Sequence, residues 1–385
     1  MKQQHVVMTV NNEFTTDYRV HREAKALVDA GYKVTLLCLF KKGLPREENR
    51  EGINVKRILD APIRLPVFAA SRRVRAVWWR ALLNQHADAY HAHDRDTLDL
   101  SARAARRFNV PLVYDSHEYW PDKNRYEHNT GNLRDRLSEW WWHRKERRYV
   151  HRAAALIMTS PGHARGLVEH YGVPMPTLVR NIPEYQRGTD AHFLRKKLGL
   201  DTNSRIAVYV GNIQRNRGLE EVITALTHLP KNVHFVAIGY GPYRKHLEQH
   251  LPDLARGRMH FIDTIPYREI VPTIHSADIG VAPFQSNCYS HRHVLPNKIF
   301  EYLMAELPVA VSNLPDMANI INAYDVGTTF VADQPKDIAR ALQDLLSDSA
   351  RLQQLKRNAR YATNTELRWD VEKKKLVTLY RGLLP

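Results

Sequence analysis

The residues from Pro296 to Glu301 have the types and the spacing to bind a nucleotide. Pro296 suits the start of a helix, and the free backbone N–H groups from Asn297 onward would form an anion site. Lys298 adds a cation in the first turn, which disfavours the helix dipole unless an anion is bound, and this mismatch indicates a phosphate. Glu301 lies one turn further on the same face, where its carboxylate could accept hydrogen bonds from ribose hydroxyls. On spacing alone, a surface Lys–Glu pair is the alternative.

Two glycine-containing strand ends could also approach phosphate groups. Gly211 ends one strand-like run, and the loop after it carries Arg215 and Arg217. Gly239 and Gly241 end another such run. Glycine permits close backbone approach, and the arginine guanidinium can donate two parallel hydrogen bonds to one phosphate. An ordinary strand-to-helix loop is the alternative for each segment alone, and their convergence with the Lys298 helix on one sheet edge favours phosphate binding.

A histidine and an acid, His117 and Glu118, follow the strand that ends at Asp115. Neutral histidine can donate to a sugar hydroxyl or to a phosphate, and it can exchange protons near neutral pH. A purely structural hydrogen bond is the alternative role for a histidine in this position.

The segment from His91 to Asp96 contains two alternating histidines, His91 and His93, and two alternating aspartates, Asp94 and Asp96. Imidazole and carboxylate are both metal ligands, so a metal site is one interpretation. We favour the other, in which this strand end shapes an acceptor cleft and holds no metal.

The elements that must position these residues alternate between strand and helix. Short buried apolar runs are separated by helix-like stretches, the first of which, 19–30, stops at Gly31. After an interruption near 174–183 the alternation resumes at 205. This pattern predicts a parallel sheet in each of two domains, with a ligand between them at the carboxyl ends of the strands. The expected strands are 5–10, 34–39, 89–92, 112–115 and 155–159, then 205–211, 234–239, 259–262, 279–282 and 309–311.

The composition narrows the class of protein. With 385 residues, 43% of them hydrophobic and 25% charged, the chain predicts two globular domains and excludes a wholly disordered protein. The two cysteines, Cys38 and Cys288, form no CxxC pair, so a cysteine zinc site and a secretory disulfide framework are not expected. No apolar run approaches the ~20 residues that span a bilayer, and no signal-peptide pattern opens the chain. We therefore expect a cytoplasmic protein.

The net charge of +16 indicates an anionic partner. Two segments combine basic residues with tryptophan, which suits the interface of an anionic bilayer. The alternative is that the tryptophans belong to the core and the arginines to a solvated face. We expect the protein to bind the cytoplasmic membrane face peripherally, through Arg72, Arg73, Arg75, Trp140, Trp141 and Trp142.

Motifs along nearly the whole chain resemble glycosyltransferase family 4, and the C-terminal block is the most specific. The motifs are Asp17, Arg19-Val20, Glu23-Ala24, Leu27 and Gly31; Tyr114-Asp115-Ser116-His117-Glu118; Gly211-Asn212 and Arg217-Gly218; Pro296-Asn297-Lys298, Glu301-Tyr302 and Leu307-Pro308-Val309. The resemblance implies an α/β GT-B fold of two Rossmann-like domains facing a cleft. It also implies retaining transfer of a hexose from a nucleotide-diphosphate sugar to a glycan or lipid-linked acceptor, in cell-surface polysaccharide synthesis, with no metal and no cofactor.

The resulting domain prediction has an acceptor-side domain at 1–185 and a nucleotide-sugar domain at 186–365. The C-terminal segment 366–385 is expected to form a helix that returns to the first domain.

The resemblance also implies roles for single residues. His117, Arg217 and Lys298 match catalytic positions, with the two basic residues beside the diphosphate, and Glu301 matches a ribose-binding glutamate. The implied donor-binding set is Gly211, Asn212, Arg215, Arg217, Gly239, Gly241, His293, Pro296, Asn297, Lys298 and Glu301, and the acceptor-side set is His93, Asp94 and Glu118.

Two positions depart from the family pattern. His293 stands where the family has a first glutamate near the transferred sugar, and Asn212 replaces a residue that is often arginine, with Arg215 as a substitute nearby.

Two other functions remain as alternatives. A nucleotide-sugar epimerase would share the fold and the donor site. A nucleic-acid-binding protein would explain the basic patches, but no nucleic-acid motif is present and the phosphate-binding strand ends would have no role.

Overall fold

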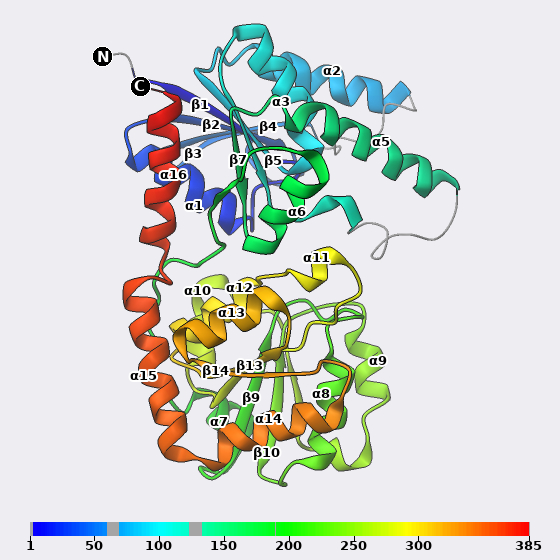
Figure 1. Ribbon diagram of the computed structural model, residues 1–385, viewed down its shortest axis with the longest axis vertical. Coiled ribbons are helices and arrows are strands. Elements are labelled where there is room, and N and C mark those ends of the chain that lie inside the picture. The colour runs from blue at the N-terminus through cyan, green and yellow to red at the C-terminus, as the bar shows by residue number, and fades with distance from the viewer. Residues whose placement is uncertain (1–2, 60–68, 123–132, 189, 385) are drawn as a thin grey trace. The chain divides into compact units, whose positions relative to one another are not determined.

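The computed structural model describes residues 3–59, 69–122, 133–188 and 190–384. The chain divides into two compact units, one formed by Met1–Arg180 with Glu372–Pro385 and the other by Asn181–Val371. Both are α/β units with a largely parallel sheet, shown in Figure 1.

The first unit contains an eight-stranded sheet in the order β3-β4-β2-β1-β5-β6-β7-β8, parallel except for the β3–β4 pair. Its strands are β1 (His5–Thr9), β2 (Lys33–Leu39), β3 (Glu47–Arg50), β4 (Ile53–Leu59), β5 (Ala89–His93), β6 (Leu112–Ser116), β7 (Ala155–Met158) and β8 (Thr177–Leu178). Its helices are α1 (Tyr18–Asp29), α2 (Ala69–Leu83), α3 (Asp94–Phe108), α5 (Leu133–Val150), α6 (Pro161–Tyr171) and most of α16 (Trp369–Leu383).

The strand order of this sheet creates a switch point. β1 lies between β2 and β5, so the chain builds outward on one side of β1 and then on the other. In open parallel sheets, ligands bind outside the carboxyl ends of the strands at such a point. The loops after β1, β5 and β6 are therefore placed for function.

The second unit has a six-stranded sheet in the order β11-β10-β9-β12-β13-β14, and its switch point lies between β9 and β12. Its strands are β9 (Arg205–Val210), β10 (Val233–Ile238), β11 (Met259–Ile262), β12 (Ile279–Ala282), β13 (Val309–Ser312) and β14 (Gly327–Phe330). Its helices are α7 (Phe193–Leu198), α8 (Leu219–Ala225), α9 (Arg244–Gln249), α10 (Tyr267–Ile274), α11 (Tyr289–Arg292), α12 (Asn297–Met304), α13 (Pro315–Tyr324), α14 (Pro335–Ser347) and α15 (Ser349–Thr365), with 3-10 turns at Leu226–His228 and Asp253–Ala255.

The apolar run of β9 shows why this sheet forms. Alternate residues of a strand point to opposite faces. Ile206 and Val208 belong to one hydrophobic cluster, and Ala207 and Tyr209 belong to another. Both faces of the strand are therefore buried, which is the typical environment of a continuous apolar run in a parallel sheet.

The last helix, α16, belongs to the first unit from Glu372 onward. Lys373 contacts Asp29 at the end of α1, with 2.7 Å between Nζ and Oδ2, and Glu372 pairs with Arg180 at 2.7 Å. Figure 1 shows α16, in red, beside α1, in blue. Deeper in the unit, the Tyr380 hydroxyl contacts His91 Nδ1 at 2.8 Å.

Candidate functional site

The loops after β9 and β10 lie against each other. Gly211 N donates to Ile238 O at 3.0 Å, and Ile213 N donates to Tyr240 O at 3.0 Å. Gly239 has φ +150°, and a Cβ there would lie 2.0 Å from Gly211 O. This close approach requires glycine, so Gly239 has a packing role that does not depend on a ligand.

Lys298 points back at the Gly211 loop from the first turn of α12. The residue is 8% exposed, and its Nζ lies 3.5 Å from the centroid of the Tyr209 ring. A Cβ on Gly211 would lie 3.2 Å from Nζ, so the ammonium group packs against the glycine backbone. The sequence prediction that Lys298 and Gly211 meet at one edge of the sheet is confirmed by these distances.

Arg217 reaches the same place from the loop before α8. Its guanidinium carbon lies 4.9 Å from the centroid of the Phe284 ring, and Lys298 Nζ lies 5.2 Å from the same centroid. Burial, followed by the positive charge of Arg217, lowers the pKa of Lys298 well below its usual value. The charge of Glu301 acts on the pKa of Lys298 in the opposite direction, but among the described residues neither cation forms an ion pair with a carboxylate. A buried cation beside a second cation with no paired acid is an arrangement that an anion would stabilise.

α12 is fixed to the switch point by Tyr302. Its hydroxyl donates to Val281 O at 3.0 Å and accepts from Val210 N at 3.0 Å, so it joins the helix to both β9 and β12. Glu301, the neighbouring residue, is buried on the same helix. Pro296 caps the helix without a side-chain hydrogen bond, and Asn297 is its first residue. Sequence reasoning did not predict the role of Tyr302.

A small polar pocket of about 180 Å³ lies at the loop before α8. Arg215 and Arg217 both line it, together with Gly218, Tyr243 and Gln285. The Arg215 guanidinium lies 5.2 Å from the centroid of the Tyr243 ring. Asn212 is exposed beside it, and its backbone carbonyl accepts from the Tyr209 hydroxyl at 2.7 Å.

His293 has an acidic neighbour of its own. Its Nδ1 lies 3.6 Å from Asp316 Oδ2, and its ring lies 4.5 Å from that of Tyr289, centroid to centroid. Asp316 is in the first turn of α13 and is buried. The side chain at this position is thus an imidazole next to a carboxylate.

In the first unit, His93, Asp94 and His117 meet at the carboxyl ends of β5 and β6. His117 Nδ1 lies 3.3 Å from Asp94 Oδ2, and His117 Nε2 lies 3.2 Å from Asp115 Oδ2. His93 Nδ1 lies 3.2 Å from His117 Nε2. Glu118 contributes a backbone carbonyl that accepts from Ser116 Oγ at 2.8 Å.

The sequence suggests a neutral His117, but the surroundings of the ring favour its protonated form. Burial disfavours the imidazolium, but the charges of Asp94 and Asp115 outweigh it and raise the pKa of His117 to about 10. The ring is therefore a cation at neutral pH.

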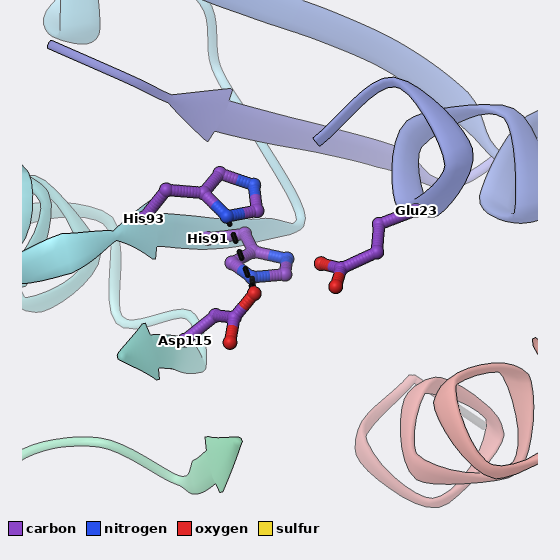
Figure 2. Close-up of side chains that lie close together, drawn as sticks. All are labelled: Glu23, His91, His93 and Asp115. Carbon is purple, nitrogen blue, oxygen red and sulfur yellow. Dashed lines mark ion pairs between the residues drawn. The ribbon is translucent and has the colours of Figure 1, made fainter. Parts of the chain in front are cut away.

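Behind these residues lies a buried ionic network. Arg19 Nη2 lies 2.9 Å from Asp115 Oδ1 and 2.9 Å from Glu23 Oε1, and Arg19 Nη1 donates to Val179 O at 2.9 Å. Figure 2 shows Glu23 of α1 facing His91, His93 and Asp115 of the sheet. Sequence reasoning placed Arg19, Glu23 and Asp115 in family motifs but did not predict that they pair.

The four side chains of Figure 2 include residue types that bind metals, and one possible ligand atom from each lies within 4.8 Å of the others. Arg19, however, already pairs with both carboxylates of the group. We therefore interpret the group as a charge-balanced network. The two alternating aspartates have different partners: Asp94 contacts His117, whereas Asp96 accepts from Asn11 Nδ2 at 3.2 Å.

The tryptophan-rich surface is smaller than the sequence predicts. Trp142 is 8% exposed and belongs to the core, and Trp141 packs edge-on against it, whereas Trp140 is 60% exposed. Arg75 pairs with buried Asp99. The predicted membrane surface is therefore wrong for Trp142 and Arg75, because the first is buried and the second is paired with a buried acid. Arg72 and Arg73 are exposed.

In the described part of the chain, no helix combines the length and the apolar character needed to cross a membrane.

Comparisons with known proteins agree with this architecture. The family model "Glycosyl transferase 4-like domain" matches residues 16–181, and "Glycosyl transferases group 1" matches residues 190–362. D-inositol 3-phosphate glycosyltransferase of Xylanimonas cellulosilytica is 24% identical over 312 residues, covering 76% of this chain and 71% of the relative.

Solved structures show the same fold. Sucrose-phosphate synthase from Thermosynechococcus elongatus superposes with a TM-score of 0.82 at 18% identity, covering 99% of each chain. HepE of Anabaena, solved in complex with UDP-glucose, gives a TM-score of 0.79 at 13% identity, covering 99% of this chain and 100% of the other. The chain therefore belongs to the group 1 glycosyltransferases, the GT4 family of GT-B enzymes that transfer a sugar from a nucleotide sugar.

Proposed function

We propose that this glycosyltransferase moves a hexosyl group, with retention of configuration, from a nucleoside diphosphate sugar to a lipid-linked glycan in cell-surface polysaccharide synthesis. The observation that carries the donor part is that two cations, Lys298 and Arg217, lie near the same Phe284 ring beside Gly211 and the start of α12, and that neither forms an ion pair with an acid of the described residues. A diphosphate would supply the missing negative charge.

The proposed chemistry follows from these charges. As the bond between the sugar and the diphosphate breaks, negative charge grows on the departing phosphate oxygens. Lys298, Arg217 and the N–H groups at the start of α12 stabilise that charge in a site largely withdrawn from water. Glu301, one turn along α12 from Lys298, accepts hydrogen bonds from the ribose hydroxyls. HepE, solved with UDP-glucose, supports this choice of donor class.

Glu301 provides the test of the donor site. We expect Glu301→Ala to weaken binding of nucleoside diphosphates about 10-fold to 100-fold, because a lost hydrogen bond that leaves a buried group unpaired costs ~1–3 kcal/mol. Binding of inorganic diphosphate, which has no ribose, should change little. Isothermal titration calorimetry with both ligands measures the difference.

The matched control is Glu269→Gln, which changes an exposed acid on α10 of the same unit. Equal nucleoside diphosphate affinity in Glu301→Ala and in the control would disprove the ribose contact.

A basic and apolar surface on the first unit supports the lipid-linked acceptor. α3 packs against both α2 and α5, so the three helices form one layer. Leu133, Leu137 and Trp140 are exposed on α5 at intervals of four and three residues, which places them on one face of the helix. Exposed arginines of the same layer are Arg72, Arg73, Arg80, Arg103, Arg106, Arg107, Arg136, Arg144, Arg147 and Arg148. Apolar residues flanked by cations suit an anionic bilayer surface.

Liposome sedimentation tests this surface. The wild-type protein should sediment with vesicles containing acidic lipid, less so as salt rises, and poorly with neutral vesicles, because each basic residue near the surface contributes ~1 kcal/mol that salt screens. The triple variant Arg72→Glu, Arg73→Glu, Trp140→Ser should lose most of this binding.

The control for net charge reverses Lys231 and Lys336, two exposed lysines of the second unit. If that variant loses sedimentation as fully as the triple variant, binding is non-specific attraction and the proposed surface is wrong.

A further inference from the structure

The His117 ring is held between two carboxylates that come from different strands. Asp94, directly after β5, faces Nδ1 at 3.3 Å, and Asp115, within β6, faces Nε2 at 3.2 Å. Both ring nitrogens of His117 thus have an acidic acceptor. An imidazole can donate from both nitrogens only in its protonated form.

Each carboxylate is itself fixed by other groups. Asp115 accepts two hydrogen bonds from Arg19 Nη2, at 2.9 and 3.1 Å. Asp94 Oδ1 accepts from the His117 backbone N at 3.0 Å and from Trp120 Nε1 at 3.1 Å. Asp94 has φ +60°, a left-handed conformation that few residues other than glycine adopt. The residue that holds His117 Nδ1 thus has an uncommon backbone conformation.

The surrounding groups differ in charge. Burial lowers the pKa of His93 and lowers that of His91 well below its usual value, so these two rings are neutral. Among the three histidines His91, His93 and His117, only His117 has a raised pKa, which the carboxylates on either side cause. Burial also raises the pKa of Glu23, to about 8. The titratable or charged groups that face it from the packed elements are Asp94 of α3, Asp115 of β6, His93 of β5, and Arg19 and Glu23 of α1.

The clamped ring is accessible from the carboxyl edge of the sheet. The His117 side chain is 18% exposed and that of Asp94 is 26% exposed, whereas Asp115 and His93 are completely buried. The only members of the cluster within reach of a ligand are therefore the cation and the acid that holds it.

We infer that Asp94 and Asp115 are positioning residues that keep His117 a permanent cation, so that it offers a fixed positive charge to an anionic group of the ligand and exchanges no proton with the acceptor. This inference rests on the proposed function, in which the nucleoside diphosphate sugar supplies the anionic group. It adds how His117 would act: the ring keeps the protons on both nitrogens and contributes only its positive charge.

Nuclear magnetic resonance of protein labelled at histidine Cε1 tests the clamp without any substrate. The His117 signal, assigned as the one missing from His117→Gln, should show no titration between pH 6 and pH 8.5 in the full-length protein. In Asp94→Asn the same signal should titrate inside that range. The matched control is Asp96→Asn, two residues along α3, whose acid contacts Asn11 and not His117, and it should behave as the wild type.

Turnover of the donor sugar against pH tests the mode of action. The wild-type profile should show no ionisation near neutral pH, whereas turnover of Asp94→Asn should fall about tenfold for each pH unit above its new titration point. A wild-type His117 signal that titrates below pH 8.5, or an Asp94→Asn variant with the wild-type titration and pH profile, would overturn the inference. The titration needs no ligand, so it decides the clamp even if the Glu301 experiment disproves the proposed donor site.

Discussion

Replacing Lys298 by methionine should reduce turnover at least 100-fold while making the unliganded protein more stable. The loss of turnover follows because a charged donor aimed at the developing negative charge of the diphosphate is worth about 10²–10³ in rate. The gain in stability follows because Lys298 is buried beside Arg217 without a paired acid, and burial lowers its pKa well below the usual value. Methionine fills a similar volume without a charge, and such changes commonly add ~0.5–2 kcal/mol to the free energy of unfolding.

The pH dependence of this stability difference has a definite sign. The folded protein binds the Lys298 proton more weakly than the unfolded chain does, so wild-type stability rises as pH increases from the lowered pKa of Lys298 towards ~10.4. The methionine variant lacks this rise. Its advantage should therefore be greatest at neutral and lower pH and should disappear near pH 10.5, as measured by urea denaturation.

A second lysine supplies the control for Lys298. Lys356, on α15 of the same unit, is half-buried, and burial also lowers its pKa. Lys356→Met should change stability without changing turnover or nucleotide affinity. If Lys298→Met keeps wild-type turnover, or still gains the same thermal protection from a nucleoside diphosphate, Lys298 is not part of the donor site.

The central strands could be predicted from the sequence because they are runs of buried apolar residues. β1, β2, β5, β6 and β7 all fall on expected runs, as do the first five strands of the second sheet. β3 was not predicted, because Glu47 to Arg50 has no apolar residue, and neither was β8, which has only two residues. β14 begins Gly327-Thr328-Thr329, and its place at the sheet edge is set by pairing with β13 and not by its own pattern. β4 was missed although Ile53 and Val55 alternate with polar residues.

The candidate site was predictable where residues close in sequence act together. Lys298 and Glu301 share one helix, and Gly211, Arg215 and Arg217 share one loop. Contacts between distant residues were not predictable, because they depend on the register of the sheet. His93 and Asp115 lie directly opposite each other only because β5 pairs with β6 in one register. The same is true of Tyr302, whose hydroxyl joins two strands that are about seventy residues apart in the chain.

The buried network beneath His117 should have the largest effect on stability. We expect Arg19→Met to lower the free energy of unfolding of the first unit by ~3–5 kcal/mol at pH 7, because removing one partner of a buried ion pair leaves an uncompensated charge. Arg19 pairs with Asp115 and Glu23 and also donates to Val179 O, so its loss affects three elements. Tryptophan fluorescence in urea reports this unit selectively, since Trp78, Trp79, Trp120, Trp140, Trp141 and Trp142 lie in it and only Trp369 lies beyond it.

The response of the Arg19 variant to pH separates a lost ion pair from lost packing. Burial would raise the pKa of Asp115, but Arg19 and then His117 outweigh it and hold that pKa well below the usual range. A carboxyl group with a lowered folded pKa stabilises the protein above its unfolded value of ~3.9, and this contribution is lost as pH falls through the folded value. In Arg19→Met, burial is no longer offset by the guanidinium, so Asp115 takes up a proton at higher pH. The difference in the free energy of unfolding between wild type and variant should narrow as pH falls from 7 towards 4, whereas a packing defect would keep it constant.

The double variant Arg19→Met, Asp115→Asn removes both charges and should recover much of the loss at pH 7. A single-variant cost below ~1 kcal/mol, or a double variant no more stable than the single one, would show that the two residues are not coupled.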